Sequence, residues 1–81
     1  MLTELSNNAK VVGAKQVKRA VADGSARKVF LAEDADPRVI EPILALCTEK
    51  GVETESVPSM KELGKACGIA VGAAVTALLR L

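Results

Sequence analysis

The basic and amide side chains that follow Gly13 are the residues of this sequence best suited to hold a ligand. Four of them share one short segment, namely Lys15, Gln16, Lys18 and Arg19. A lysine ammonium donates hydrogen bonds, and a glutamine amide both donates and accepts them. Residues 10–28 carry six basic side chains and one acidic, a net charge of +5, whereas the whole chain has a net charge of +1. This concentration predicts a polyanionic partner, although a solvated helix face would carry the same charges.

A second set of chemically capable residues is acidic. Asp34 and Asp36 follow the apolar run Val29–Ala32, and carboxylates at a strand end can bind a divalent cation or exchange protons. The pair Asp36-Pro37 is, however, typical of a helix start, with aspartate as the N-cap and proline as the first helical residue. We favour the structural interpretation and keep a small metal-dependent enzyme as a third hypothesis.

Composition limits the function further. The chain has no histidine and only two cysteines, Cys47 and Cys67, so histidine-activated nucleophiles and zinc sites with imidazole ligands are excluded. We therefore expect no enzyme, no cofactor, and no catalytic or metal site. The cysteines are expected to be reduced and buried as small packing residues, although a single disulfide or a redox role stays open.

The length of 81 residues predicts a single domain, 1–81, with an aliphatic core, because 49% of the residues are hydrophobic and only Phe30 is aromatic. No stretch is long and apolar enough to span a bilayer, and Met1–Lys10 does not resemble a secretion signal. We expect a cytoplasmic monomer that does not engage a membrane.

Apolar spacing and turn residues place these side chains on an alternation of strands and helices. Val17, Ala20 and Val21 recur at helical spacing, so the neighbouring basic residues face away from the core. Strand–helix alternation favours an α/β fold ending in a buried strand. The elements predicted are helices over 2–9, 14–23, 37–50 and 60–66, and strands over 10–12, 29–32, 52–57 and 73–79.

The late apolar segment is ambiguous on sequence alone. Ile69 and Val71 lie in a glycine-flanked loop, where they could be core residues or an exposed patch for a partner, and their spacing by itself favours core. Gly64 interrupts the preceding helix, which indicates close packing or close approach of a ligand. Pro42 is expected to loosen or kink the first turns of its helix.

Three segments in this order resemble one known family. They are Gly13–Arg19, Val29–Pro37 and Pro58–Ala74, and together with the length of the chain they look like the L7Ae/L30e superfamily of kink-turn RNA-binding ribosomal proteins. Within that superfamily, the chain is most similar to the small bacterial members of YbxF type. The resemblance covers essentially the whole sequence. It implies a three-layer α/β/α sandwich around a mixed four-stranded sheet.

The resemblance also implies a function, which is non-catalytic binding of kink-turns, RNA duplexes bent at a bulge beside sheared G·A pairs. Lys15 and Gln16 match positions that face guanine edges, where other members often carry Asn and Glu. Ile69–Val71 matches the loop that packs on the bulge, and Ala70 stands where several relatives have Glu. The complete predicted RNA-binding set is Gly13, Ala14, Lys15, Gln16, Lys18, Arg19, Lys28, Glu33, Ile69, Ala70 and Val71, in which Lys28 is included because its charge would offset phosphate repulsion.

The implied partners are structured RNAs that contain a kink-turn, in ribosomal RNA, a riboswitch or a small ribonucleoprotein, and the ribosome itself. The residues support this because guanine presents two acceptors, O6 and N7, to which lysine can donate. A scarcity of aromatic side chains argues against stacking on plain single strands. The alternative is a ribosome-associated protein–protein adaptor that uses Ile69–Val71 without reading RNA directly.

Overall fold

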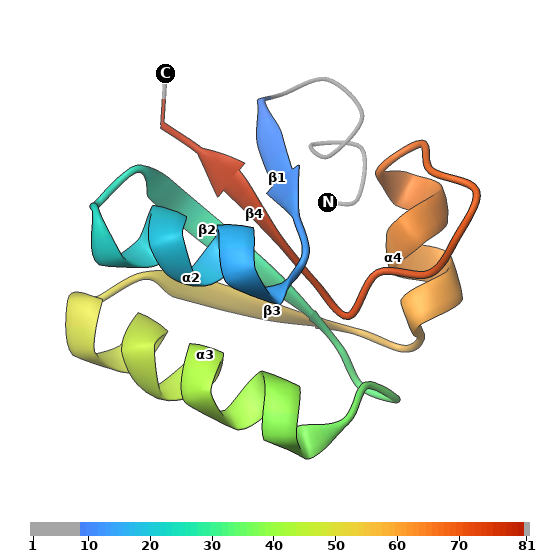
Figure 1. Ribbon diagram of the computed structural model, residues 1–81, viewed down its shortest axis with the longest axis horizontal. Coiled ribbons are helices and arrows are strands. Elements are labelled where there is room, and N and C mark those ends of the chain that lie inside the picture. The colour runs from blue at the N-terminus through green and yellow to red at the C-terminus, as the bar shows by residue number, and fades with distance from the viewer. Residues whose placement is uncertain (1–8, 81) are drawn as a thin grey trace.

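The structure, a computed structural model, describes residues 9–80 and is a three-layer α/β/α sandwich, as predicted (Figure 1). Helices α2 and α3 cover one face of a four-stranded sheet and α4 covers the other. The predicted helix over residues 2–9 falls outside the described residues, except for Ala9. The elements are β1 (Lys10–Val12), α2 (Ala14–Ala22), β2 (Ala26–Ala32), α3 (Pro37–Lys50), β3 (Glu53–Val57), α4 (Met60–Ala66) and β4 (Val75–Leu79).

The sheet is mixed and has the strand order β1-β4-β2-β3. Strand β4 runs antiparallel to both β1 and β2, whereas β2 and β3 are parallel. The carboxyl ends of β1, β2 and β3 therefore lie at the same end of the sheet as the start of β4. The segments that follow these strands, and the loop that leads into β4, meet at this end of the sheet, which we call the rim.

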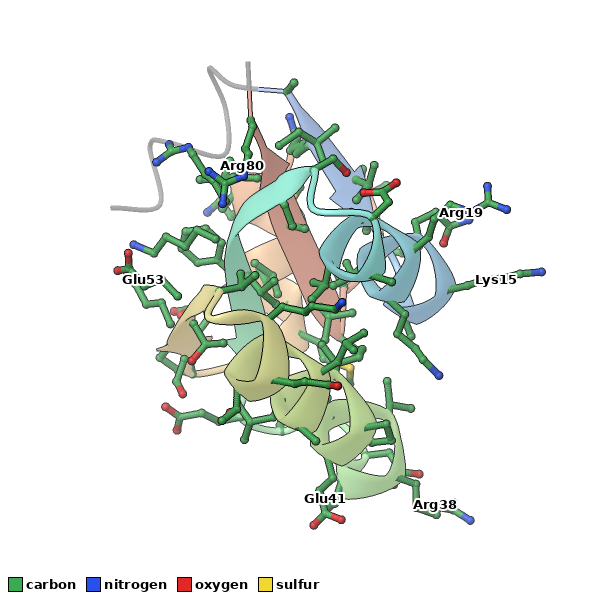
Figure 2. The ribbon with its side chains drawn as sticks, turned by 90° about the vertical axis from the view of Figure 1, so that its left-hand side faces the viewer. Lys15, Arg19, Arg38, Glu41, Glu53 and Arg80 are labelled. Atoms are coloured by element: carbon green, nitrogen blue, oxygen red, sulfur yellow. The ribbon has the colours of Figure 1, made fainter. Side chains whose placement is uncertain are left out.

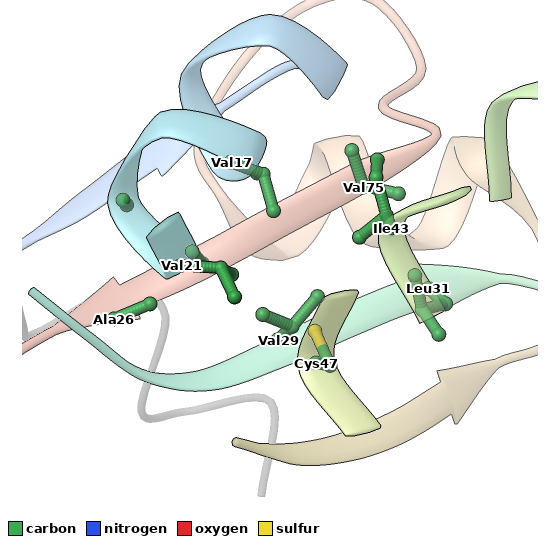
Figure 3. Packing of buried hydrophobic residues seen from close by; sticks show 10 residues of the cluster. Val17, Val21, Ala26, Val29, Leu31, Ile43, Cys47 and Val75 are labelled. Carbon is green, nitrogen blue, oxygen red and sulfur yellow. The ribbon is translucent and has the colours of Figure 1, made fainter. Parts of the chain in front are cut away.

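The core consists of two aliphatic clusters separated by the sheet. Val17 and Val21 of α2 pack with Ile43 of α3 against one face (Figure 3). Phe30 packs with Leu63 of α4 on the other face. Each of these side chains is fully buried. Because alternate residues of β2 feed opposite clusters, this central strand holds the three layers together.

The two cysteines are buried and free, as predicted. Cys47 belongs to the cluster under α2 and α3, and Cys67 belongs to the cluster under α4, where its thiol lies 3.4 Å from the Thr76 hydroxyl. The sheet separates the two sulfur atoms, so they do not form a disulfide with each other. Burial raises the pKa of the Cys47 thiol, which lowers its reactivity.

Local sequence signals explain most of the helix boundaries. Asp36 caps α3, since its carboxylate accepts a hydrogen bond from the backbone N–H of Arg38 at 2.9 Å. The Ser59 hydroxyl caps α4 by accepting from the N–H of Glu62 at 3.1 Å. Helix α3 ends at Gly51, which has a left-handed backbone with φ of 71°. It continues through Pro42, which is exposed and has no backbone N–H to donate to the carbonyl of Arg38 one turn earlier.

The prediction that β2 begins at Val29 was wrong, because the strand begins at Ala26. The sequence did not indicate this extension, because charged residues such as Arg27 and Lys28 are not typical of a buried strand. The extension pairs with the end of β4, with a register irregularity between Ala26 and Lys28. Within residues 9–80, no helix is long and apolar enough to cross a membrane.

Candidate nucleic-acid interface

Helix α2 begins at the rim, directly after β1. Gly13 occupies the N-cap position with φ of 107°, and no side chain caps the helix. The first turn contains no acidic residue. The first N–H groups of a helix have no intrahelical acceptor, and they carry the positive end of the helix dipole. This start is therefore suited to an electronegative ligand.

The glycine at this position also leaves room for the neighbouring amide. A Cβ atom built on Gly13 would lie 3.0 Å from Oε1 of Gln16, so the Gln16 side chain folds back over the helix start. Only glycine combines this space with a positive φ at low energy. Gly13 therefore positions Gln16 as well as turning the chain from β1 into α2.

The polar face of α2 forms a shallow basic surface. Val17, Ala20 and Val21 point into the core, whereas Lys15 and Arg19 project outward on one side of the molecule (Figure 2). A hollow of about 240 Å³ is lined by Lys15, Gln16 and Arg19. Lys18 is exposed on the same helix, and Ala14 is half-buried at its start. The structure thus brings together all six residues predicted between Gly13 and Arg19.

The loop between α4 and β4 carries the second part of the predicted site. Ile69 and Val71 are exposed, with 36% and 70% of their surface accessible. The spacing-based preference for core residues was therefore wrong, and the alternative of an exposed apolar patch is what the structure shows. Ala70 is exposed between them. Two exposed branched aliphatics in one loop form a surface suited to an apolar partner.

Two glycines hold this loop against α4. A Cβ atom on Gly64 would overlap the carbonyl oxygen of Val71, and one on Gly72 would lie 3.1 Å from Cβ of Met60. Backbone hydrogen bonds from Ile69 to Gly64 (3.1 Å) and from Ala73 to Met60 (3.0 Å) complete the attachment. Gly64 therefore serves close packing, one of the two roles that the sequence indicated.

A backbone hydrogen bond joins the two parts of the site. The N–H of Gly13 donates to the carbonyl oxygen of Val75 at 3.1 Å, which ties the start of α2 to the first residue of β4. Val75 directly follows the loop that contains Ile69–Val71. The basic helix start therefore lies beside the point where the loop from α4 enters β4 (Figure 1).

Lys28 lies apart from these residues. It sits in the first half of β2, towards the opposite end of the sheet, and its side chain is only 12% exposed. Its ammonium lies 2.9 Å from Glu55 and 3.6 Å from Glu53, and 5.1 Å from the centre of the Phe30 ring. We predicted that Lys28 offsets phosphate repulsion in a bent RNA, and this stays a prediction, while in the structure its ammonium is paired with carboxylates.

The acidic residues after β2 have structural partners. Asp34 accepts a hydrogen bond from the backbone N–H of Met60 at 2.8 Å, and Asp36 forms an ion pair with Arg38 at 2.8 Å. The Arg38 guanidinium holds the pKa of the Asp36 carboxyl below its usual range. Within residues 9–80, no group of three or more potential metal ligands is present. Glu33 is exposed at the rim, where its N–H donates to Val57.

The link between Asp34 and Met60 was not foreseen from the sequence. It connects the turn after β2 to the start of α4, and α4 in turn carries the apolar loop. No local pattern reveals a hydrogen bond between residues 26 positions apart, so the sequence offered no signal for it.

Fold and rim together define a class of protein, a small α/β/α sandwich that presents a basic helix start and an apolar loop at one end of its sheet. Residues 3–80 match the ribosomal protein L7Ae/L30e/S12e/Gadd45 family. The chain belongs to this family.

Individual proteins and solved structures are also similar to this chain. The RNA-binding protein YbxF of Geobacillus stearothermophilus is 51% identical over 70 residues, which cover 86% of this chain and 85% of the relative. An RNA-binding protein of Bacillus pumilus is 45% identical over 69 residues, covering 85% and 84%. Among solved structures, the Giardia lamblia 15.5kD RNA binding protein matches with a TM-score of 0.93 at 28% identity, covering 99% of this chain and 71% of that one.

Proposed function

We propose that this protein binds structured RNA without catalysis, and that it recognises and stabilises kink-turns. The observation that carries the proposal is the Gly13–Val75 hydrogen bond, which joins the start of α2 to the first residue of β4, directly after the loop that contains Ile69–Val71. The names of the relatives support the RNA-binding part, since they are RNA-binding proteins of the same family.

The chemistry of the rim fits a kinked RNA better than a regular duplex. A regular A-form helix hides its guanine O6 and N7 atoms in a deep, narrow groove. A kink with sheared pairs exposes such edges, where Lys15 can donate and Gln16 can donate or accept. Ile69 and Val71 then cover the apolar face of a splayed bulge nucleotide. The two parts of the site thus match two neighbouring features of one RNA.

The basic residues of α2 also explain how the protein would stabilise the bend. Bringing two RNA stems together increases phosphate repulsion, which Lys15, Lys18 and Arg19 offset. Because the protein binds the kinked form more tightly than the extended form, it shifts the population towards the kink. No covalent step is needed. The expected cytoplasmic location and monomeric state form part of this proposal, and cell fractionation and sedimentation check them.

The test is a titration of the double variant Lys15→Ala/Gln16→Ala against a fluorescent kink-turn duplex. We expect a loss of about 1–3 kcal/mol for each base contact removed, which is about fivefold to 150-fold in Kd per contact. Lys50→Ala is the matched control, since it removes an exposed lysine at the far end of α3 from the rim. A second control is the same duplex with its G·A pairs replaced by G·C.

Three results would contradict the proposal. The double variant would bind as tightly as the parent protein, or the G·C duplex would bind as well as the kink-turn, or fluorescence transfer between the duplex ends would show no bending on binding. Binding of a protein partner at Ile69–Val71, with no RNA binding at all, would favour the adaptor hypothesis instead.

A further inference from the structure

A groove that shares only Glu33 with the predicted RNA-binding residues lies between α3 and the outer strand β3. It has a volume of about 310 Å³, and its walls include Ile40, Glu41 and Leu44 of α3 and Thr54 and Ser56 of β3. Leu44 is 41% exposed and lines the groove beside Ile40. The groove therefore offers an apolar floor beside a sheet edge.

Strand β3 is an edge strand. In the strand order β1-β4-β2-β3 it pairs with β2 alone, and no other strand formed by residues 9–80 lies on its outer side. Edge strands present backbone N–H and C=O groups that can pair with an added strand. Its five residues, Glu53–Val57, are long enough to template a short extended segment.

The charges of the groove select the kind of segment. Glu33 and Glu41 line it and no basic residue does. In the part of the chain that the structure describes, neither carboxylate forms an ion pair, whereas Glu55 on the opposite face of β3 is paired with Lys28. The groove thus carries uncompensated negative charge, which repels RNA and attracts cationic side chains.

We propose that this groove binds an extended, lysine- or arginine-rich polypeptide segment of a partner protein, which pairs with the outer edge of β3. Side chains of an added strand alternate between its two faces, so those on the α3 side meet Leu44 and Glu41. Backbone pairing supplies a sequence-independent part of the affinity, and the carboxylates select basic residues. The surface is separate from the helix start that contacts RNA in the proposed function.

The test uses the full chain and a short fluorescein-labelled peptide of alternating lysine and valine. Two comparison peptides carry glutamate in place of each lysine, or a central proline. We expect saturable binding of the lysine peptide alone, and amide shifts in NMR spectra at Leu44, Thr54 and Ser56. Glu41→Lys should weaken binding about tenfold or more. Glu49→Lys is the matched control, because it makes the same charge change on α3 outside the groove, and it should alter binding less than about twofold.

Several results would overturn this proposal. They are no binding of the lysine peptide, equal binding of the glutamate peptide, equal effects of E41K and E49K, or amide shifts at Thr54 and Ser56 on adding RNA. Concentration-dependent dimerisation lost in E41K would show that a second copy occupies the groove instead. Thermal melting of both variants verifies folding. The double variant Lys15→Ala/Gln16→Ala should lose RNA and keep the peptide, so the failure of either proposal is distinguishable from failure of the other.

Discussion

At the scale of single residues, two exposed side chains have different roles, one in the proposed binding and one in the stability of the fold. Val71 is 70% accessible, so its side chain contributes little to folding, although it lies in the loop that we assign to the RNA bulge. Asp34, by contrast, is polar and exposed but ties the turn after β2 to α4. The chemistry of a side chain alone does not reveal which of these roles it has.

We predict that Val71→Ala weakens kink-turn binding and leaves stability unchanged. The lost apolar contact is worth about 1 kcal/mol, or roughly fivefold in Kd. The free energy of unfolding should change by less than about 0.5 kcal/mol because the site is exposed. RNA titration and urea unfolding measure the two quantities. Leu44→Ala removes an exposed aliphatic away from the proposed interface, and equal RNA effects of the two variants would argue against the loop assignment.

At the scale of elements, the apolar loop depends on α4 for its position. Gly64 is buried, and the carbonyl of Val71 occupies the space that a side chain would need. This contact, rather than flexibility, explains a glycine in the middle of a seven-residue helix. Geometry at the rim is therefore sensitive to a residue that does not itself touch the proposed ligand.

We predict that Gly64→Ala displaces the loop and weakens RNA binding, even at temperatures well below the melting temperature, where the variant is folded. The overlap should also destabilise the fold by about 1–3 kcal/mol. Gly24→Ala is a suitable control, since Gly24 has a positive φ of 83° but nothing within 4 Å of its Cβ position. It strains the backbone at the opposite end of the sheet. Should both variants lose RNA affinity in proportion to stability, the positioning role of Gly64 would be refuted.

The start of α3 makes stability depend on pH. Arg38 and the helix N–H groups stabilise the charged form of Asp36, so its pKa in the folded protein lies below the ordinary value of 3.8. The stabilisation is fully present above that ordinary value and is lost as the pH falls through the lower, folded value. Asp23 acts in the same direction, because hydrogen bonds from Ser25 lower its pKa.

We therefore predict that Asp36→Asn lowers stability at neutral pH and flattens the acid limb of the stability curve. Asparagine keeps the capping oxygen and removes only the charge. Denaturant midpoints measured from neutral pH to below 3.8 test this, with Glu49→Gln as an exposed control on the same helix. An acid limb as steep in D36N as in the parent protein would contradict the assignment.

At the scale of the whole molecule, the basic side chains of α2 lie away from the β3 side. Lys15 and Arg19 project from one side, and Glu53 and Arg80 lie on the opposite one (Figure 2). A net charge of +1 conceals this arrangement. Such a distribution orients the protein as it approaches a polyanion and keeps the β3 side turned away. The same separation leaves the acidic groove available to a basic polypeptide.

We predict that the logarithm of the RNA association constant falls linearly with the logarithm of the salt concentration. Arg19→Gln should make the slope of this line less steep by about one. The reason is that each phosphate contact releases about one condensed counterion. Titrations at several salt concentrations measure the slope. Lys50→Gln, at the far end of α3, should leave it unchanged. Equal slopes for R19Q and the parent protein would remove Arg19 from the phosphate contacts.

The sequence by itself determined the number and kind of elements after residue 9, the N-caps at Asp36 and Ser59, the outward orientation of the basic face of α2, and the aliphatic core. These features arise from residues close in the chain, where periodicity, capping and turn geometry act. The family resemblance added the layered architecture.

Tertiary structure alone decided the rest. The extension of β2 to Ala26, the pairing of Lys28 with Glu53 and Glu55, the exposure of Ile69 and Val71, and the bond from Asp34 to Met60 all depend on segments distant in sequence. Whether a branched aliphatic side chain is buried depends on what packs over it, and whether a lysine is available depends on which carboxylates a neighbouring strand brings near. Neither quantity is encoded in local spacing, because both follow from how the sheet assembles.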